Sequence, residues 1–199
     1  MLALAVTSCS GGDDDDDAAR DDTATSSTEM VKATVDLTVG RADLVSPHAA
    51  LGPLDEGTKN AVERAVEDLL LITSASPLVE GKAGAGFADL FTPDAGAKAS
   101  GADRDVFFDE GLPRFGEIVP EEATVEMTGL AGSMGPATAL VIAEFRWNVV
   151  SSERTTDRVV RAGELQLIPD GDAWKIGAYT LVVTRTVADQ TTTTTATTR

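Results

Sequence analysis

The stretch that decides the fold class is residues 156–187, TDRVVRAGELQLIPDGDAWKIGAYTLVVTRTV. Apolar and polar residues alternate through most of it, as they do in half-buried β-strands. The pair Asp170-Gly171 stands in the middle, and this dipeptide is the strongest short signal for a two-residue hairpin turn. A turn there places Leu167 opposite Trp174 and makes one face of the hairpin consistently apolar, which fixes the register of a sheet. We therefore predict an antiparallel pair of strands.

Two more strands with the same alternation precede this hairpin. The longer one has Phe145 and Trp147 on one face and Glu144 and Arg146 on the other. Short segments that contain Gly and Pro separate the strands, as expected for turns. The sequence thus predicts a four-stranded antiparallel meander. Its strands are expected at residues 124–130, 139–150, 156–168 and 173–187.

The second face of the predicted hairpin is less polar than a face in contact with water should be. Apolar side chains alternate there with Arg158, Glu164 and Lys175. We expect something to cover this face: the N-terminal strand region, a loop, or a second copy of the chain in a homodimer. The residues expected in such an interface are Val160, Tyr179, Leu181 and Val183.

Helices are predicted in the N-terminal half of the domain. Thr58 suits an N-cap position, and apolar residues then recur at three- and four-residue steps until Ser76-Pro77 ends the pattern. Shorter helices are expected after Thr92 and after Asp103.

A leading strand is predicted at residues 31–39, where apolar and polar residues alternate and Gly40 ends the pattern. The fold class expected for residues 31–187 is therefore α+β. An N-terminal strand and helices would pack on a curved C-terminal four-stranded antiparallel sheet.

The order of the elements and the last hairpin resemble a known superfamily. Over residues 58–187, a helix, small helices and a meander ending in DGDAWKIGAY (170–179) look like the nuclear-transport-factor-2-like superfamily, which includes SnoaL-like proteins. The resemblance implies a cone-shaped α+β fold with an apolar pocket in its mouth, and often dimers through the open sheet face. Large side chains on the inward sheet face either line such a pocket or form plain core. These side chains are Met127, Phe145, Trp147 and Trp174.

The first residues, MLALAVTSCS, place an apolar stretch and small residues directly before the single cysteine, Cys9. This resembles the bacterial lipobox, with Val6-Thr7-Ser8-Cys9 at the cleavage and lipidation positions, although a signal peptide carries a longer apolar segment. The resemblance implies that residues 1–9 are the remnant of a signal peptide and that a diacylglycerol is attached to Cys9. Two acyl chains hold a protein stably at a membrane. We expect a lipid-anchored protein on the outer side of the cell membrane.

Low-complexity segments flank the expected domain. Residues 10–30 include the run Asp13–Asp17 and few apolar side chains, so we expect a disordered acidic spacer. Residues 188–199 are rich in threonine, and we expect a disordered tail there. Arg outnumbers Lys 11 to 5, which suits a GC-rich genome such as that of an actinobacterium.

The composition argues against several classes of function. The net charge is −17 without a basic stripe, so nucleic-acid binding is not expected. One cysteine and one histidine, His48, give no ligand set for zinc or an iron–sulfur cluster, and we expect neither metal nor cofactor. No nucleophile-elbow, zinc-protease or phosphate-loop motif is present. The carboxylates of Asp109, Glu110 and Glu144 are expected to be solvated surface charges.

These inferences lead to one main hypothesis and one alternative. The main hypothesis is a membrane-anchored cell-envelope lipoprotein with a non-enzymatic binding or scaffold domain, for a small apolar ligand or a protein partner. The alternative is an enzyme or degenerate enzyme of the SnoaL-like type, acting on an apolar substrate with Tyr179 as hydrogen-bond donor.

Overall fold

The structure is a computed structural model that describes residues 32–47, 49–132, 137–171 and 173–198. The predicted lipidation residue Cys9, the spacer at 10–30 and His48 lie outside the described residues.

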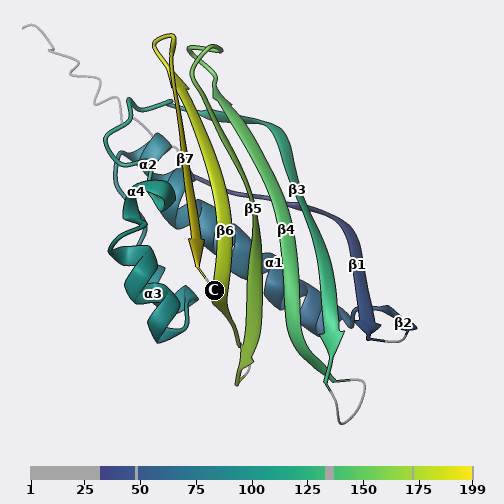
Figure 1. Ribbon diagram of the computed structural model, residues 1–199. Coiled ribbons are helices and arrows are strands. Elements are labelled where there is room, and N and C mark those ends of the chain that lie inside the picture. Colours follow the sequence, from purple (N-terminus) through teal and green to yellow (C-terminus); the bar gives the residue numbers. More distant parts are fainter. Residues whose placement is uncertain (1–31, 48, 133–136, 172, 199) are drawn as a thin grey trace, which may run out of the picture. The chain divides into compact units, whose positions relative to one another are not determined.

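A mixed β-sheet dominates the described part of the chain (Figure 1). Seven strands of the described residues form it in the order β2-β1-β3-β4-β5-β6-β7, with β1 and β3 parallel and every other neighbouring pair antiparallel. The prediction of a four-stranded antiparallel sheet is therefore wrong. The strands are β1 (Thr38–Ser46), β2 (Ala49–Pro53), β3 (Ile118–Ala131), β4 (Thr138–Ser151), β5 (Arg158–Asp170), β6 (Ala173–Val187) and β7 (Gln190–Thr198).

Helices pack against one face of this sheet, and α1 crosses it diagonally (Figure 1). We call the sheet face that packs against the helices the inner face and the opposite one the outer face. The helical elements are α1 (Glu56–Leu70), the π-helix η1 (Leu71–Ala75), α2 (Ser76–Glu80), the 3₁₀-helix η2 (Phe87–Leu90), α3 (Pro93–Ser100) and α4 (Arg104–Phe107).

Helix α1 forms where its apolar periodicity predicts it. Val62 and Val66 are fully buried, as expected for residues four apart on one helix face. The N-cap is Asp55, whose Oδ1 accepts a hydrogen bond of 2.9 Å from the Thr58 amide. The helical run also continues past the predicted stop, through Pro77 in the first turn of α2. The carbonyls of Ile72 and Thr73, one turn before this proline, accept hydrogen bonds of 3.0 Å from the amides of Gly84 and Asp109 instead.

The β5–β6 hairpin has a different register from the predicted one. Asp170 pairs with Ala173, and a bulge near Gly177 shifts the ladder between Gln166 and Leu167. A shift of one residue sends every following side chain to the other face of the sheet. From Tyr179 onward, β6 therefore points the side chains expected on the second face toward the helices.

The predicted interface residues consequently lie on two faces, which corrects that prediction. Tyr179, Leu181 and Val183 are 1%, 2% and 0% exposed and belong to the core. Val160 alternates with the buried Val159 and Arg161 on β5 and lies half-buried on the outer face. These four residues cannot form one exposed patch.

Residues 32–37 alternate as predicted but form no strand. Ala33 and Leu37 are buried, and the Leu37 amide donates a 3.1 Å hydrogen bond to Oε1 of Glu67 on α1. Strand β1 begins only at Thr38 and continues through Gly40, the predicted end. The alternation correctly marks which side chains face the core, although the backbone partner of Leu37 is a helix side chain.

The threonine-rich tail predicted to be disordered forms the edge strand β7. Its first residue, Gln190, pairs with Val187, and the pairing with β6 runs on to Thr198. Threonine is β-branched and suits a strand, and Ala196 fills a place in the core at 4% exposure.

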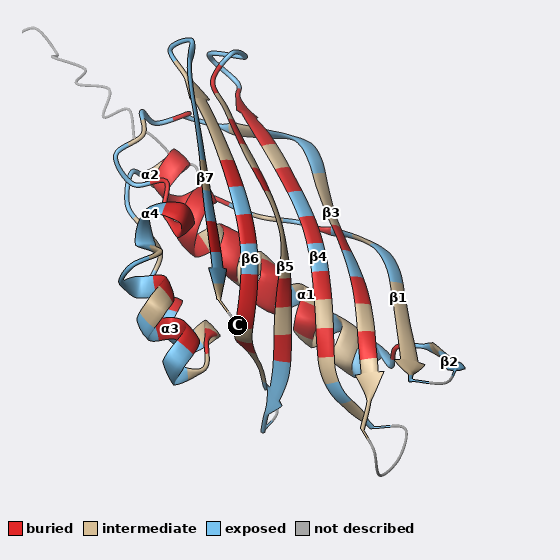
Figure 2. Ribbon diagram, viewed as in Figure 1, coloured by how far each residue is buried: buried red, intermediate tan, exposed pale blue. Residues whose placement is uncertain are grey.

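The core lies between the helices and the inner face. On β4 the buried residues alternate with exposed or half-buried ones, which Figure 2 shows as bands of colour along the strands. A second group of side chains, drawn from η2, α4, the residue after each of them and β6, forms an aromatic cluster with ring centroids 4.7–6.2 Å apart. Its members are Phe87, Phe91, Phe107, Phe108 and Tyr179.

Candidate functional site

Three glutamates lie side by side on the outer face. Glu126 on β3 pairs with Glu144 on β4, which in turn pairs with Glu164 on β5. Side chains directly opposite each other on neighbouring antiparallel strands stand about 4.5–5.5 Å apart at Cβ. The three carboxylates therefore form one row across three strands, the glutamate row.

The glutamate row lies in an open hollow of about 590 Å³ on the outer face. Neighbouring positions on the same strands complete its wall, including a single basic residue, Arg146. The residues that line the hollow are Thr124, Glu126, Glu144, Phe145, Arg146, Ala162, Gly163 and Glu164.

Local contacts compensate the charges of the row only weakly. Arg41, at the neighbouring strand, approaches Glu126 with 3.8 Å between Nη2 and Oε2, and both side chains are more than half exposed. Gln166 donates a 3.3 Å hydrogen bond to Oε1 of Glu164. Among the described residues, Glu144 in the centre has neither an ion pair nor a side-chain hydrogen bond. The hollow is thus a region of concentrated negative charge.

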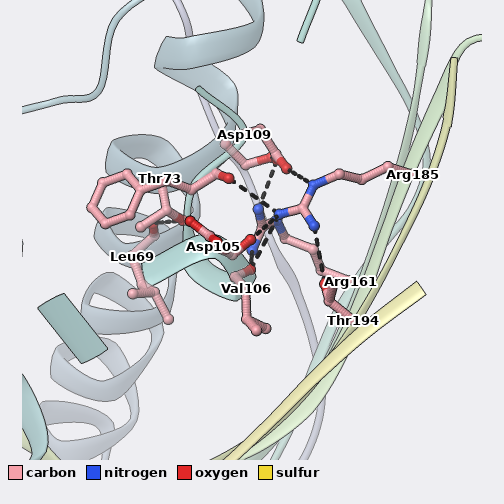
Figure 3. A network of polar contacts seen from close by, with 10 residues as sticks. Leu69, Thr73, Asp105, Val106, Asp109, Arg161, Arg185 and Thr194 are labelled. Atoms are coloured by element: carbon pink, nitrogen blue, oxygen red, sulfur yellow. Dashed lines mark hydrogen bonds and ion pairs between the residues drawn. The ribbon is translucent and has the colours of Figure 1, made fainter. Parts of the chain in front are cut away.

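A second polar cluster is buried between the helices and the inner face (Figure 3). Its centre is Asp109, which lies in the strap at residues 108–117 that joins α4 to β3. Oδ1 of Asp109 is 2.6 Å from Nε of Arg185 on β6, and Oδ2 is 2.7 Å from Nη2 of Arg161 on β5. The hydroxyl of Ser74 in η1 also donates to Oδ2.

The arginines of this buried cluster also bind backbone carbonyls of α4 and of the first residue of the strap. Nη2 of Arg185 donates to the carbonyls of Asp105, Val106 and Phe108 at 3.1, 3.3 and 3.2 Å. Nη1 of Arg161 donates to the same Val106 carbonyl at 3.1 Å. The cluster therefore ties the helical layer to the sheet.

Two features describe the electrostatics of the cluster. Burial lowers the pKa of the Arg161 guanidinium below its ordinary value, Arg185 acts in the same direction, and Asp109 opposes them. Within the described residues, Nε of Arg161 has no hydrogen-bond partner. Both carboxylate oxygens of Asp109 are engaged, so this residue is not a free general base.

Tyr179, the donor considered for an enzyme, is already engaged. Its hydroxyl donates a 2.7 Å hydrogen bond to Oδ2 of Asp103, and its ring packs edge-on against Phe107 in the aromatic cluster. Burial raises the pKa of the Tyr179 hydroxyl well above its ordinary value, and the Asp103 carboxylate acts in the same direction. The phenol is neutral at physiological pH and holds α4's N-terminal side against β6.

The residues predicted to line an apolar pocket lie in different surroundings. Met127, Phe145 and Trp147 are 0%, 3% and 2% exposed and belong to the core. Trp174 is half-buried at one end of β6, where it borders a hollow of about 190 Å³ beside the charged residue Asp68 on α1. The structure therefore does not bring these four side chains together in one pocket.

Comparisons with protein-family models, with curated proteins and with solved structures found no match to this chain. The lipobox resemblance and the resemblance to nuclear-transport-factor-2-like proteins thus stay predictions. No helix among the described residues has the length and apolar character to cross a lipid bilayer. In the same part of the chain, no group of three His, Cys, Asp or Glu side chains is arranged to hold a metal ion.

Sequence reasoning missed both polar clusters. Asp109 was expected to be solvated and is 1% exposed. Glu144 was correctly placed on the face opposite Phe145, but its alignment with Glu126 and Glu164 depends on the register of three strands. The available sequence signal is an acidic residue, Glu144, on the polar face of the longest predicted strand, where Arg146 follows two residues later.

Proposed function

We propose that this chain is a membrane-tethered, non-enzymatic binding domain that docks a basic segment of a partner protein on the outer face of its sheet. The glutamate row in its open hollow is the observation that carries this proposal. The tether is the diacylglycerol predicted on Cys9.

The glutamate row gives the folded domain no evident benefit of its own. Like charges directly opposite each other on neighbouring strands destabilise a sheet. In the described part of the chain, the exposed Arg41 and the amide of Gln166 contact the two ends of the row, while Arg146 stands in the same hollow without an ion pair to the three glutamates. A lysine or arginine side chain from a partner would remove this cost, so the arrangement favours a cationic occupant.

The surroundings of the row fit a protein segment better than a lone ion. Two half-buried apolar side chains lie on the same face: Ile142 two residues from Glu144 on β4, and Val160 four residues from Glu164 on β5. A segment that combines basic and apolar residues would match both features.

The test uses the full chain with Cys9→Ser, so that neither lipid nor an intermolecular disulfide contributes. Titration of the ¹⁵N-labelled protein with an oligolysine peptide should shift amide signals of β3, β4 and β5. The triple variant Glu126→Gln/Glu144→Gln/Glu164→Gln should weaken binding at least about tenfold, as expected when more than 1.4 kcal/mol is lost. An acidic peptide of equal length should not bind.

The matched control removes the same number of charges from the helical layer, with Glu56→Gln/Glu63→Gln/Glu80→Gln. This variant should bind oligolysine almost as well as the parent protein. Equal weakening in both triple variants would show that only the overall charge of −17 attracts the peptide, and would refute the proposed site.

A further inference from the structure

The two edges of the sheet differ in how they are protected. Edge strands expose unpaired N–H and C=O groups, and proteins normally shield them with short length, bulges, charges or proline. At one edge, β2 has five residues, includes Pro53 and pairs with β1 through a bulge. At the other edge, β7 has nine residues, QTTTTTATT, without charge or proline. No bulge interrupts its pairing with β6.

The pairing of β7 defines which backbone groups face outward. Val187 pairs with Gln190 across a two-residue hairpin loop, and the pair that closes such a loop exchanges hydrogen bonds. The backbone N–H and C=O groups of the even-numbered residues of β7 therefore point toward β6. Odd-numbered residues present their N–H and C=O to the free edge. The contact of Lys98 agrees with this, because its Nζ donates to the carbonyl of Thr197 at 2.6 Å.

Three residues of β7 therefore have outward backbone groups that another strand could pair with. Among the described residues, nothing donates to or accepts from the outward backbone groups of Thr191, Thr193 and Thr195. The hairpin end of β7, where Thr191 lies, projects beyond the helices in Figure 1.

We propose that β7 is a self-association edge, to which a second copy of this chain adds its own β7 in antiparallel orientation. The pairing is centred on Thr193, so that Thr191 of each copy pairs with Thr195 of the other. The two sheets then continue into one, related by a twofold axis, as in most homodimers.

Charge and composition favour a second copy as the occupant. A register centred on Thr193 places Asp189 of one copy opposite Thr197 of the other, next to the Lys98 ammonium that holds the Thr197 carbonyl. Asp189 of one copy thus comes near Lys98 of the other, which in its own chain lies 4.0 Å from Oδ2 of Asp103. The strand between the two ends of the interface is uncharged. Elsewhere the net charge of −17 keeps copies of the chain apart.

Threonine pairs across the interface would repeat an arrangement that the domain already contains. The hydroxyls of Thr184 and Thr193 lie 3.1 Å apart between β6 and β7, as do those of Thr186 and Thr191. Threonine–threonine pairs on neighbouring strands are favourable. Because β7 has threonine at nearly every position, an antiparallel copy provides such pairs along its length.

This inference does not depend on the proposed binding function, because it concerns the sheet's edge and not its outer face. Strands paired antiparallel across a twofold axis keep the same faces on the same side. The two glutamate rows of a dimer would then face in one direction.

Sedimentation equilibrium and native mass spectrometry of the full chain with Cys9→Ser test the proposal. The parent protein should show a reversible dimer. Thr193→Pro removes the central outward N–H at an edge position, where proline is compatible with a strand, and should leave only monomer. Thr193→Val keeps the backbone donor and should still dimerise. A monomeric parent protein at all concentrations, or a Thr193→Pro dimer of unchanged stability, would overturn the proposal.

Crosslinking tests the register and remains informative even if proline loosens β7. In the proposed dimer the two copies of residue 193 form a hydrogen-bonded pair with Cα atoms about 5.5 Å apart, within the range of disulfides. In the Cys9→Ser background, Thr193→Cys should crosslink rapidly on mild oxidation. Thr191→Cys should not, because its partner is Thr195. Equal crosslinking at both positions would contradict the ordered pairing.

Discussion

Asp109 and Arg161 form an ion pair with 2.7 Å between Oδ2 and Nη2, and their side chains are 0% and 3% exposed. Arg185 approaches the other oxygen of the same carboxylate at 2.6 Å. One acidic side chain thus balances two arginines from neighbouring strands. Desolvation offsets much of the attraction in a buried ion pair, so the pair itself adds little stability. Removing one partner is nevertheless strongly destabilising, because it leaves the other charge buried without compensation.

Asp109→Ala is expected to destabilise the domain by about 3–5 kcal/mol, because it leaves two buried or nearly buried guanidinium groups without their carboxylate. Arg161→Met should cost less, since Asp109 keeps its contact with Arg185. Urea unfolding followed by circular dichroism measures both differences. The control is Glu110→Gln, which removes an exposed pair with Arg104 and should change the stability by less than about 1 kcal/mol. Equal losses for Asp109→Ala and Glu110→Gln would contradict the assigned role.

The stability of the domain should depend on the ionisation of Glu67. Burial raises the pKa of this carboxyl above its ordinary value, the nearby Glu63, Asp36 and Asp68 act in the same direction, and the Leu37 amide opposes them. A carboxyl whose pKa is higher in the folded state stabilises that state when protonated and loses this contribution as the pH rises through the folded pKa.

Glu67→Gln should therefore increase the free energy of unfolding at neutral pH, because the amide oxygen can still accept the hydrogen bond from Leu37. The gain should shrink below about pH 4, where the glutamate itself is protonated in both states. Urea unfolding at the two pH values measures it, with Glu80→Gln as a variant of equal charge change on α2. A gain that does not depend on pH would indicate a packing effect instead.

The glutamate row itself predicts a stability change. Glu144→Gln, at the centre of the row, should stabilise the domain by about 0.2–1 kcal/mol at low ionic strength, because it removes repulsion from both neighbours. High salt should reduce the gain, since exposed charges are screened. Glu122→Gln, at an exposed position near the start of β3, is the control. Destabilisation by Glu144→Gln would mean that the row contributes favourable contacts to folding.

The sequence predicted those parts of the fold that depend on local pattern. The apolar periodicity of α1 and the alternation along β4 both placed the correct side chains in the core, including Trp147 at 2% exposure. These patterns do not depend on which strand is the neighbour, because they reflect only the burial of one helix face or one strand face.

Pairing across long distances could not be predicted in the same way. No turn signal connects β1 with β3, which pair in parallel across the whole helical layer. The bulge at Gly177 shifted the face of Tyr179, and an isolated glycine in a strand is only a weak bulge signal. The low complexity of β7 indicated disorder, although threonine also favours strands.

The candidate sites depend on these non-local pairings. Glu126, Glu144 and Glu164 become a row only once two registers are known. Asp109 is a buried partner of Arg161 because the strap folds back against the inner face. No residue spacing in the sequence predicts that contact.

Gly163 and Gly177, both on the β5–β6 hairpin, should respond oppositely to an added methyl group. A Cβ at Gly163 would collide with the Thr180 carbonyl and stand 2.6 Å from Cδ2 of Leu181, whereas at Gly177 the nearest atom is 3.7 Å away. Gly163→Ala should cost about 1–3 kcal/mol, as overpacking does. Gly177→Ala should be neutral or slightly stabilising, because it restricts the unfolded chain. Thermal unfolding of both variants measures the contrast, and a harmless Gly163→Ala would contradict the close approach of β5 and β6.

The loop between β6 and β7 contains backbone strain that a single substitution should relieve. Ala188 and Asp189 have φ values of 48° and 64°, a left-handed conformation that costs a non-glycine residue about 1–2 kcal/mol. Ala188→Gly should therefore stabilise the domain by about 1 kcal/mol, and the backbone hydrogen bond from residue 188 to Asp157 remains available. Ala196→Gly, in the same hairpin but at a buried strand position, should destabilise it. Denaturant unfolding distinguishes the two signs. If both variants lost stability, strand pairing and not loop strain would limit how firmly β7 is held at the edge of the sheet.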